Sequence, residues 1–494
     1  MKIETIIEYM NADASNFNPA LLEARVNSFA TDSRRVQAGE VFFAFSQPDF
    51  QNNCFNGEFA DSHIYIPSAF EKGVVACVAR RDRFAEHRAI LGEFADRLIF
   101  ADDAILAFQN LAHGVYLEWK KPVIAITGSA GKTTAKELTA HVLEHSGRKI
   151  LRNIKNYNNG LGLPMTVLNL AKDDSYDAAV LEMGMSTPHN EIARLCKITP
   201  PDVAVELNVL PVHVEHLGSI ENVAKAKAEL IEGMKADGTA ILNADDWRVA
   251  AMRDLHKGQT ITFGIENAAD VSASEIKMER FGETSFILNL PDEKAEVRFA
   301  LSGKHNVLNA LAAAAVGFSF GMSARTIADA LQTVEPPPQR GEILHFADNF
   351  TVINDSYNSN PAALLGMVET LVEGGSEAKR RIVVAGEMLE LGADERKIHA
   401  ETGAKLAASG IDFLIGVRGL ANEMTKSASA NNLKESRFFE NSDAAGEFLA
   451  NEIKAGDLVL VKGSRGVRTE KVIEKLLSKY ELENREIEKE FNRG

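Results

Sequence analysis

A glycine-flanked turn that ends in lysine and threonine carries the clearest chemistry of this sequence. The apolar run Val123–Ile126 precedes it, and a helical pattern of apolar residues follows from Ala135 onward. A strand that enters a helix through such a turn presents backbone N–H groups at the positive end of the helix dipole, where phosphate binds well. We expect Lys132 to reach the terminal phosphates and Thr133 to hold a magnesium ion. The turn therefore predicts a site for ATP and Mg²⁺, formed by Gly128, Ser129, Ala130, Gly131, Lys132, Thr133 and Thr134.

The spacing of the two glycines differs from that of the usual phosphate-binding loop. The usual loop has four residues between its glycines, whereas only Ser129 and Ala130 lie between Gly128 and Gly131. The strand before the turn and the amphipathic helix after it still supply the context that a phosphate site needs.

Two further residues lie at the ends of predicted strands. Glu182 follows the apolar run Ala178–Leu181, where a carboxylate is suited to be another oxygen ligand of Mg²⁺. The alternative is a solvated glutamate at a strand end. His213 lies just past the next strand, and the residues alone leave open whether it is a ligand or a structural histidine.

Lys227 lies on the apolar face of a predicted helix. Val223 precedes it by four residues, and Leu230 and Ile231 follow it by three and four, so these side chains are its neighbours on the helix surface. A lysine in apolar surroundings is costly unless it reaches water, binds an anion or loses its charge. Reaching water is the ordinary explanation, and a role in the phosphate site is the alternative.

Three polar loops could bind ligands. Gly303–Asn309 leads into an alanine-rich helix, and its asparagines could cap that helix or present amides to an adenine. Asn354–Pro361 is richer in Asp, Tyr and Asn than a turn requires, and Lys462–Arg465 is a cationic loop suited to a carboxylate or phosphate. The candidate residues are Asn306, Asn309, Asp355, Tyr357, Asn358, Asn360, Lys462, Ser464 and Arg465.

The elements that must position these residues indicate an α/β fold. Strands alternate with helices from 123 to 242, which predicts a parallel sheet with helices on both faces and a phosphate site at its carboxyl edge. Short alternating strands at 258–300 predict a small β appendage. The proline-rich linker 335–341 precedes a second doubly wound unit, and the tail from Lys479 reads as a frayed helix.

We therefore expect three domains, at 1–117, 118–334 and 335–494. The first has strand-like segments at 41–45, 74–79 and 98–100, with a polar loop from Gln47 to Gly57.

Composition excludes several classes of protein. The formal net charge of -16 argues against nucleic acid and against anionic membranes as partners. The three cysteines are far apart, so we expect reduced thiols and neither a disulfide framework nor a zinc site. The N-terminus does not read as a signal peptide and there is no long apolar run, so we expect a cytoplasmic protein without membrane insertion.

Taken together, these motifs resemble those of the Mur ligases over nearly the whole chain. The shortened glycine loop is the form typical of that family. Asp-Ser-Tyr-Asn-x-Asn-Pro, Met-Leu-Glu-Leu-Gly and Lys-Gly-Ser-Arg are similar to the motifs of the members that add a dipeptide. The resemblance rests on Thr127–Thr134, Asn156–Asn159 with Gly162 and Pro164, Glu182–Gly184, His213, Lys227, Gly303–Asn309, Arg340, Asp355–Pro361, Gly386–Gly392 and Lys462–Arg465.

The resemblance implies a fold and a reaction. The fold would be a central P-loop-type parallel-sheet ATPase domain, flanked by a smaller N-terminal α/β domain for the UDP end and a C-terminal Rossmann-like domain for the dipeptide. The reaction would join D-alanyl-D-alanine to UDP-N-acetylmuramoyl-tripeptide through an acyl phosphate, using ATP, in peptidoglycan synthesis. A monomer is the default expectation.

The resemblance also implies roles for residues. Thr133 and Glu182 would hold one Mg²⁺, and Glu182 with His213 would help hold a second, with Lys227 present as a carbamate. Lys132, His213 and Lys227 would be catalytic. Asn306 or Asn309, Asp355 and Tyr357 would contact adenosine, and Arg340 the γ-phosphate. The substrates would be bound by Ser33, Arg34, Asn156, Asn159, Asn358, Asn360, Lys462, Ser464 and Arg465.

Some positions depart from the family pattern. Asp61-Ser62-His63 replaces Asp-Gly-His after an atypical segment at 47–57, and Gly386-Glu387-Met388 replaces Gly-Asp-Met. Two other functions are less consistent with these residues. The dipeptide-type motifs disfavour a folylpolyglutamate-type ligase, and an intact set of Lys132, Glu182, His213 and Lys227 disfavours a nucleotide-binding scaffold without chemistry.

Overall fold

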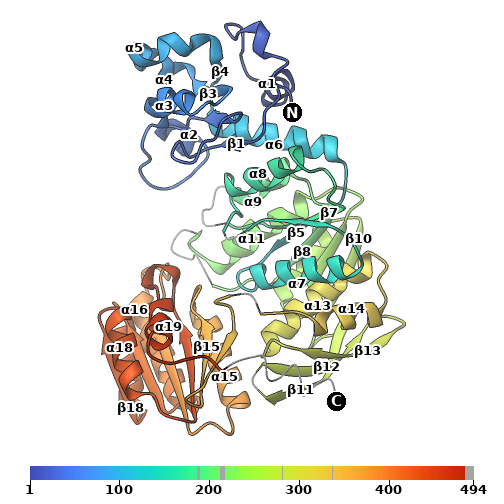
Figure 1. Cartoon of the computed structure of the whole chain (residues 1–494). Helices are drawn as coiled ribbons and strands as arrows, with labels where there is room; N and C mark the ends of the chain where they lie inside the picture. Colours follow the sequence, from blue (N-terminus) through green and yellow to red (C-terminus); the bar gives the residue numbers. More distant parts are fainter. Residues whose placement is uncertain (155, 186–189, 212–216, 281, 337, 484–494) are drawn as a thin grey trace.

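The computed structural model describes residues 1–494 except 155, 186–189, 212–216, 281, 337 and 484–494. The chain forms three α/β units in sequence order, from the blue N-terminal part through the green and yellow centre to the orange and red C-terminal part (Figure 1). Their sheets have four, nine and six strands. The predicted α/β class is confirmed. No helix in the described ranges is long and apolar enough to cross a membrane.

The N-terminal sheet is parallel, in the order β1-β2-β3-β4. Phe108 on α6 belongs to the same apolar cluster as Val123 of the central sheet, so the two units share one core. The elements are β1 (Phe29–Ala30), β2 (Val41–Phe43), β3 (Ala76–Arg80), β4 (Leu98–Ala101), α1 (Ile3–Met10), α2 (Gln47–Asn52), α3 (Ile66–Glu71), α4 (Arg81–Glu86), α5 (Arg88–Leu91) and α6 (Ala104–Trp119).

The segment after Phe45 is not wholly the polar loop that the sequence predicts. Its first part is α2, because the Asp49 carboxylate accepts hydrogen bonds from the amide and the hydroxyl of Ser46 and so fixes a helix start. Asp49 is fully buried. The short polar stretch has no helical periodicity to reveal this.

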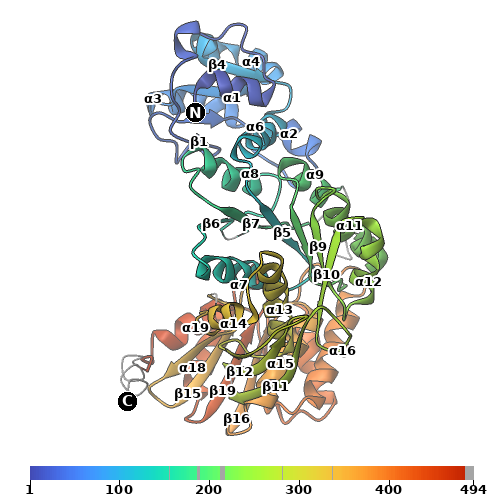
Figure 2. The ribbon, with the colours of Figure 1, turned by 90° about the vertical axis from the view of Figure 1, so that its right-hand side faces the viewer.

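The central sheet has the order β13-β12-β11-β10-β9-β8-β5-β7-β6. Helices α7, α13 and α14 cover one face, and α9 and α11 the other (Figure 2). The chain leaves β5 for β6 and β7 on one side and returns to β8 on the other, which creates a crevice at the carboxyl ends of β5 and β8. The strands are β5 (Val123–Thr127), β6 (Ile150–Arg152), β7 (Ala178–Glu182), β8 (Val203–Glu206), β9 (Thr239–Asn243), β10 (Gln259–Gly264), β11 (Val271–Arg280), β12 (Glu283–Asn289) and β13 (Lys294–Phe299).

The small β appendage that the sequence predicts is made of strands, but they belong to the central sheet. β10 and β11 continue the parallel sheet beyond β9, and β12 then pairs antiparallel with both β11 and β13. Alternation within a short strand does not tell which sheet the strand joins. The helices of this unit are α7 (Lys132–His145), α8 (Gly162–Val167), α9 (Glu191–Ile198), α11 (Ile220–Glu232), α12 (Trp247–Ala250), α13 (Lys304–Ser319) and α14 (Ala324–Gln332).

The C-terminal sheet has the order β14-β15-β19-β16-β17-β18, with β14 antiparallel to an otherwise parallel sheet. Up to Glu483 the tail is not the predicted helix, since Glu483 donates to the His345 carbonyl and lies along β14. The elements are β14 (Glu342–Phe346), β15 (Phe350–Asp355), β16 (Arg380–Gly386), β17 (Phe413–Val417), β18 (Glu435–Phe439), β19 (Asp457–Lys462), α15 (Pro361–Gly374), α16 (Glu395–Ala408), α17 (Ala421–Ala430), α18 (Ser442–Glu452) and α19 (Glu470–Leu477).

Candidate active site

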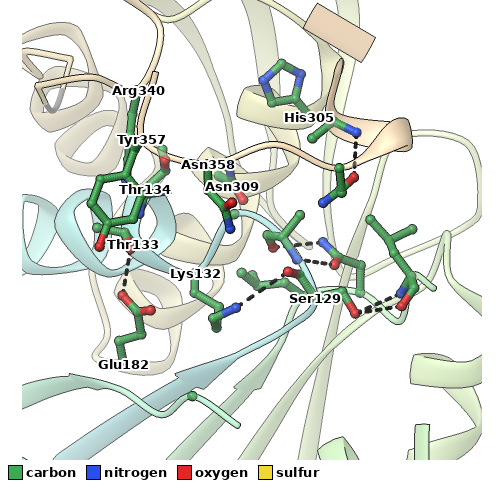
Figure 3. A pocket seen from close by; sticks show the side chains of 18 of the residues that line it. Ser129, Lys132, Thr133, Thr134, Glu182, His305, Asn309, Arg340, Tyr357 and Asn358 are labelled. Atoms are coloured by element: carbon green, nitrogen blue, oxygen red, sulfur yellow. Dashed lines mark hydrogen bonds between the residues drawn. The ribbon is translucent and has the colours of Figure 1, made fainter. Parts of the chain in front are cut away.

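A cavity of about 630 Å³ lies where the three units meet. Its walls come from the loop after β5, the ends of β7 and β8, the start of α13, and the carboxyl ends of β15 and β19 (Figure 3). The segment Cys54–Asn56 adds a wall from the N-terminal unit. Side chains from all three units therefore line one cavity.

The phosphate loop after β5 requires its glycines. Gly128 has φ 155° and Gly131 has φ 85°. A Cβ added to Gly131 would lie 2.4 Å from the side-chain oxygen of Asn309 on α13. The backbone conformation and the packing both exclude larger residues. Lys132 begins α7, and its Nζ donates to the Gly128 carbonyl at 2.8 Å.

Asn208, which the sequence analysis missed, pins this loop to the segment after β8. Its side chain accepts from the Ala130 amide at 2.9 Å and donates to the Ala130 carbonyl at 3.1 Å, and its own carbonyl accepts from the Ser129 amide. The Ser129 hydroxyl also donates to the Leu210 carbonyl. A polar residue just after a strand is common, so the sequence carries no specific signal for this role.

Glu182 stands beside the phosphate loop, as predicted, and is 4% exposed. The Thr133 hydroxyl donates to one of its carboxylate oxygens at 2.7 Å, and the Asn158 amide donates to the other at 2.8 Å. Asn153 holds the backbone of Glu182 through two hydrogen bonds of 2.9 Å. Asn153 and Asn158 are thus supporting residues that the sequence analysis did not select.

The oxygen atoms of Thr133 and Glu182 fit a magnesium ion. The described part of the chain holds no cluster of three or more Asp, Glu, His or Cys side chains. Mg²⁺ does not need one, because it is bound by one or two protein oxygens together with phosphate oxygens and water. His213 lies outside the described residues, so its role stays a prediction.

Lys227 faces a buried carboxylate that the sequence analysis missed. Lys227 is 2% exposed on α11, and burial together with the charge of Lys132 lowers its pKa to about 7. Glu206 ends β8 fully buried, and neither of its carboxylate oxygens has a hydrogen-bond partner among the residues that the structure describes. Burial raises the pKa of Glu206 to about 8, although Lys227 and Lys132 oppose the shift. A lysine with such a pKa is available as a neutral amine, which a carbamate requires.

The two asparagines of α13 line the cavity and do not cap their helix. The helix begins after Gly303, with no side-chain cap. Asn306 donates to the Ser302 carbonyl at 2.9 Å, and Asn309 donates to the side-chain oxygen of Asn306 at 3.3 Å. The capping alternative is therefore wrong, and adenine contact stays a prediction.

The C-terminal unit contributes an ion pair and a cation–aromatic contact to the cavity. Lys462 at the end of β19 pairs with Asp355 at the end of β15 at 2.5 Å, and also donates to the Asn358 carbonyl at 3.0 Å. The Arg340 guanidinium lies 4.2 Å from the ring centre of Tyr357 (Figure 3). Asp355 and Lys462 therefore bind each other, although the resemblance assigns them to different substrates.

Several predicted substrate residues are engaged within the protein. Asn360 lines the cavity but caps α15 by accepting from the Ala363 amide, and Asn159 accepts from the Gly162 amide. Ser464 accepts from the Leu389 amide, and Arg465 pairs with Glu470 at 3.1 Å. The cavity lining does not include Ser33, Arg34, Asn156, Ser464 and Arg465.

Ser33 and Arg34 form a separate polar group on the N-terminal unit. The Arg34 guanidinium donates to Asp32 through two bonds of 2.9 Å, and Lys72 donates to the Ser33 carbonyl at 2.7 Å. Arg34 is 87% exposed. This arrangement keeps a cation available to solvent away from the central cavity.

The central and C-terminal units match models of known protein families. Residues 126–317 match the Mur ligase middle domain, and residues 339–465 match the Mur ligase, glutamate ligase domain. The chain is 32% identical to UDP-N-acetylmuramoyl-tripeptide--D-alanyl-D-alanine ligase of Bacillus subtilis, over 93% of this chain and 95% of the relative. The chain belongs to the Mur ligases, in the MurF branch of the family.

Solved MurF structures agree with this assignment. A crystal structure of MurF from Acinetobacter baumannii superposes with a TM-score of 0.84 at 27% identity, covering 97% of this chain and 99% of that one. MurF from Thermotoga maritima in complex with ADP gives a TM-score of 0.79 at 27% identity, covering 92% and 98%. The layout of this Mur ligase is thus that of MurF along nearly its whole length, and ATP use is supported by the ADP-bound relative.

Proposed function

We propose that the chain joins D-alanyl-D-alanine to UDP-N-acetylmuramoyl-tripeptide, with conversion of ATP to ADP and phosphate. The observation that carries the proposal is the single cavity, to which all three units contribute. An ATP-dependent amide ligase has to bind a phosphate donor, a carboxylate and an amine side by side, within bonding distance of one another, and one shared cavity allows this. The resemblance to a full-length relative of that named activity supplies the substrates.

The phosphate loop acts first in this proposal. The backbone amides at the start of α7 and the Lys132 ammonium bind the phosphate oxygens, and they stabilise the charge that builds up as the γ-phosphoryl group moves to the substrate carboxylate. Mg²⁺, held by Thr133 and Glu182, neutralises phosphate charge when bound. Arg340 also lines the cavity and adds a second cation: burial lowers the pKa of Lys132, and the nearby charge of Arg340 lowers it further.

The C-terminal loops bind the incoming dipeptide in this proposal. Asn358 lines the cavity beside the buried Lys462–Asp355 pair, and this pair fixes the cation so that little reorganisation is needed when a carboxylate arrives. The dipeptide amine then attacks the acyl phosphate, and phosphate leaves as the amide forms. Ser33 and Arg34 bind the UDP end outside the cavity.

The proposal also covers the compartment, the oligomeric state and a second metal site. We place the reaction in the cytoplasm, where ATP is available, and take the chain to act as a monomer on small-molecule substrates. Lys227 carries a carbamate that contributes to a second Mg²⁺ site together with His213.

Phosphate release tests the substrate pair. Purified protein with ATP and Mg²⁺ is given the UDP-tripeptide, the dipeptide, or both. Release that needs both substrates is the expected result. No release with the pair, while ATP still binds, would contradict the substrate assignment and leave the nucleotide site intact.

A further inference from the structure

The N-terminal unit reaches the cavity at one place among the described residues. Cys54, Phe55 and Asn56 line the same space as Lys132 and Glu182, and they are its only lining residues from the first 117 that the structure describes. The resemblance assigns no role to this segment, which follows the unexpected helix α2.

Hydrogen bonds hold the segment firmly on its own unit. The Asn53 side chain donates to both oxygens of Asp103 at 3.0–3.1 Å and to the Asp49 carbonyl at 2.9 Å. The Phe55 amide donates to the Phe50 carbonyl, and the two rings meet edge to face with centres 5.7 Å apart. Such contacts leave the segment little freedom to move away from the cavity.

The segment is also tied to the central unit. Arg194 on α9 donates to the Asn53 carbonyl at 2.8 Å. A Cβ added to Gly160 would lie 3.5 Å from the Phe55 ring, so that ring packs over the glycine. The segment therefore bridges the N-terminal unit and the wall of the cavity that carries Asn158 and Glu182.

We propose that Cys54–Asn56 is the surface on which the peptide part of the acyl substrate lies. The inference rests on the proposed function. The UDP end of the acyl substrate binds near Arg34, outside the cavity. The carboxylate to be phosphorylated, at the other end of the same molecule, has to reach Lys132 inside the cavity. The peptide that joins these ends must enter from the N-terminal unit, and this segment is that unit's wall. Asn56 offers an amide to peptide N–H and C=O groups, and Phe55 offers an apolar ring.

The natural cysteines supply a direct test. Cys77 and Cys196 are 0% and 2% exposed, whereas Cys54 is partly exposed at the cavity. Iodoacetamide should therefore alkylate Cys54 first, as read by peptide mass spectrometry. We expect saturating UDP-N-acetylmuramoyl-tripeptide to slow this alkylation at least tenfold, and UDP or UDP-N-acetylmuramic acid alone to slow it less than twofold.

Two alkylation results would overturn the inference. One is equal protection by UDP and by the tripeptide form. The other is a Cys54 that does not react without substrate, because the segment would then not face the cavity. If the wild-type enzyme makes product while either result holds, the proposed function stands and only this inference fails. If the wild-type enzyme makes no product, the proposed function is contradicted before this inference is tested.

Steady-state kinetics distinguish a direct contact between Asn56 and the peptide from a structural role of Asn56. Asn56→Ala should raise KM for the UDP-tripeptide about tenfold, with kcat and the KM for ATP within twofold of wild type. Gln51→Ala is the matched control, because Gln51 lies on α2, is exposed and does not line the cavity. Unchanged KM in Asn56→Ala, or an equal change in Gln51→Ala, would contradict a contact with the peptide.

Discussion

At the scale of single residues, the site gathers charges that a protein interior ordinarily excludes. Burial lowers the pKa of Lys132, while the Glu182 carboxylate opposes the shift. The Lys132 ammonium donates to a carbonyl of its own loop, with Nζ 2.8 Å from the Gly128 oxygen. This carbonyl orients the amine, so that a phosphate group meets a cation already in position.

Lys132→Ala should therefore lower kcat by about 10²–10³, which is the usual loss when one preorganised donor is removed. Far-UV circular dichroism and the melting temperature would show that the variant is folded. Turnover within tenfold of wild type in the phosphate-release assay would exclude a phosphate role for this amine.

Glu206 is the residue whose charge should affect stability most. Its pKa of about 8 in the folded protein exceeds the ordinary 4.5. Between these pH values the folded chain keeps a proton that the unfolded chain releases, so the contribution of Glu206 to stability falls as pH rises from about 4.5 to 8. At pH 8.5 Glu206 is ionised while Lys227, with a pKa of about 7, is mostly neutral, so an apolar residue of similar size at position 206 removes a buried charge without leaving Lys227 charged and unpaired.

Glu206→Leu should accordingly raise Tm over wild type by about 2–5 °C at pH 8.5, and by less at pH 5. Thermal unfolding followed at both pH values measures the two differences. A Tm difference that is the same at pH 5 and pH 8.5 would show that Glu206 carries no raised pKa.

At the scale of elements, β5, the phosphate loop and α7 act as one unit with α13. Asn208 accepts a hydrogen bond from the loop on one side, and Asn309 packs against Gly131 on the other. The positions of the phosphate-binding amides thus depend on a helix more than 150 residues later in the chain, since Gly131 and Asn309 meet only in the folded protein.

Gly131→Ala tests whether the contact with Asn309 matters beyond the backbone strain that any side chain would cause at this φ. It should cost more folding stability than the roughly 1–3 kcal/mol of backbone strain alone and weaken ADP binding more than tenfold, because Asn309 or the loop must move. Gly147→Ala is the control: Gly147 has a similar φ of 86°, and a Cβ there meets nothing within 4 Å. Equal stability losses in both variants would mean that the Asn309 contact is unimportant.

Local pattern predicted much of the fold and only part of the site. The strand β5, the loop and α7 were readable because periodicity and glycine spacing are local signals. The joining of β10 and β11 to the central sheet was not readable, since strand pairing is set by tertiary contacts. Lys227 was found from its apolar helix face. Glu206 and Asn208 were not, because one polar residue at a strand end looks the same whether it is buried or solvated.

At the scale of the whole molecule, all three units contribute loops or strand ends to one cavity. Lys132 and Glu182 come from the central sheet, Asp355 and Lys462 from the C-terminal sheet, and Cys54–Asn56 from the N-terminal unit. No single unit could bring a phosphate donor, a carboxylate and an amine together. The account therefore predicts that the phosphoryl group passes to the substrate carboxylate before the amide forms.

The most direct test of that order follows oxygen atoms. The UDP-tripeptide is prepared with oxygen-18 in its terminal carboxylate and converted with ATP and D-alanyl-D-alanine, and the released phosphate is analysed by mass spectrometry. An acyl phosphate transfers one carboxylate oxygen to phosphate, so each phosphate released should carry one oxygen-18 atom. Product formation with unlabelled phosphate would contradict the acyl-phosphate mechanism on which the account rests.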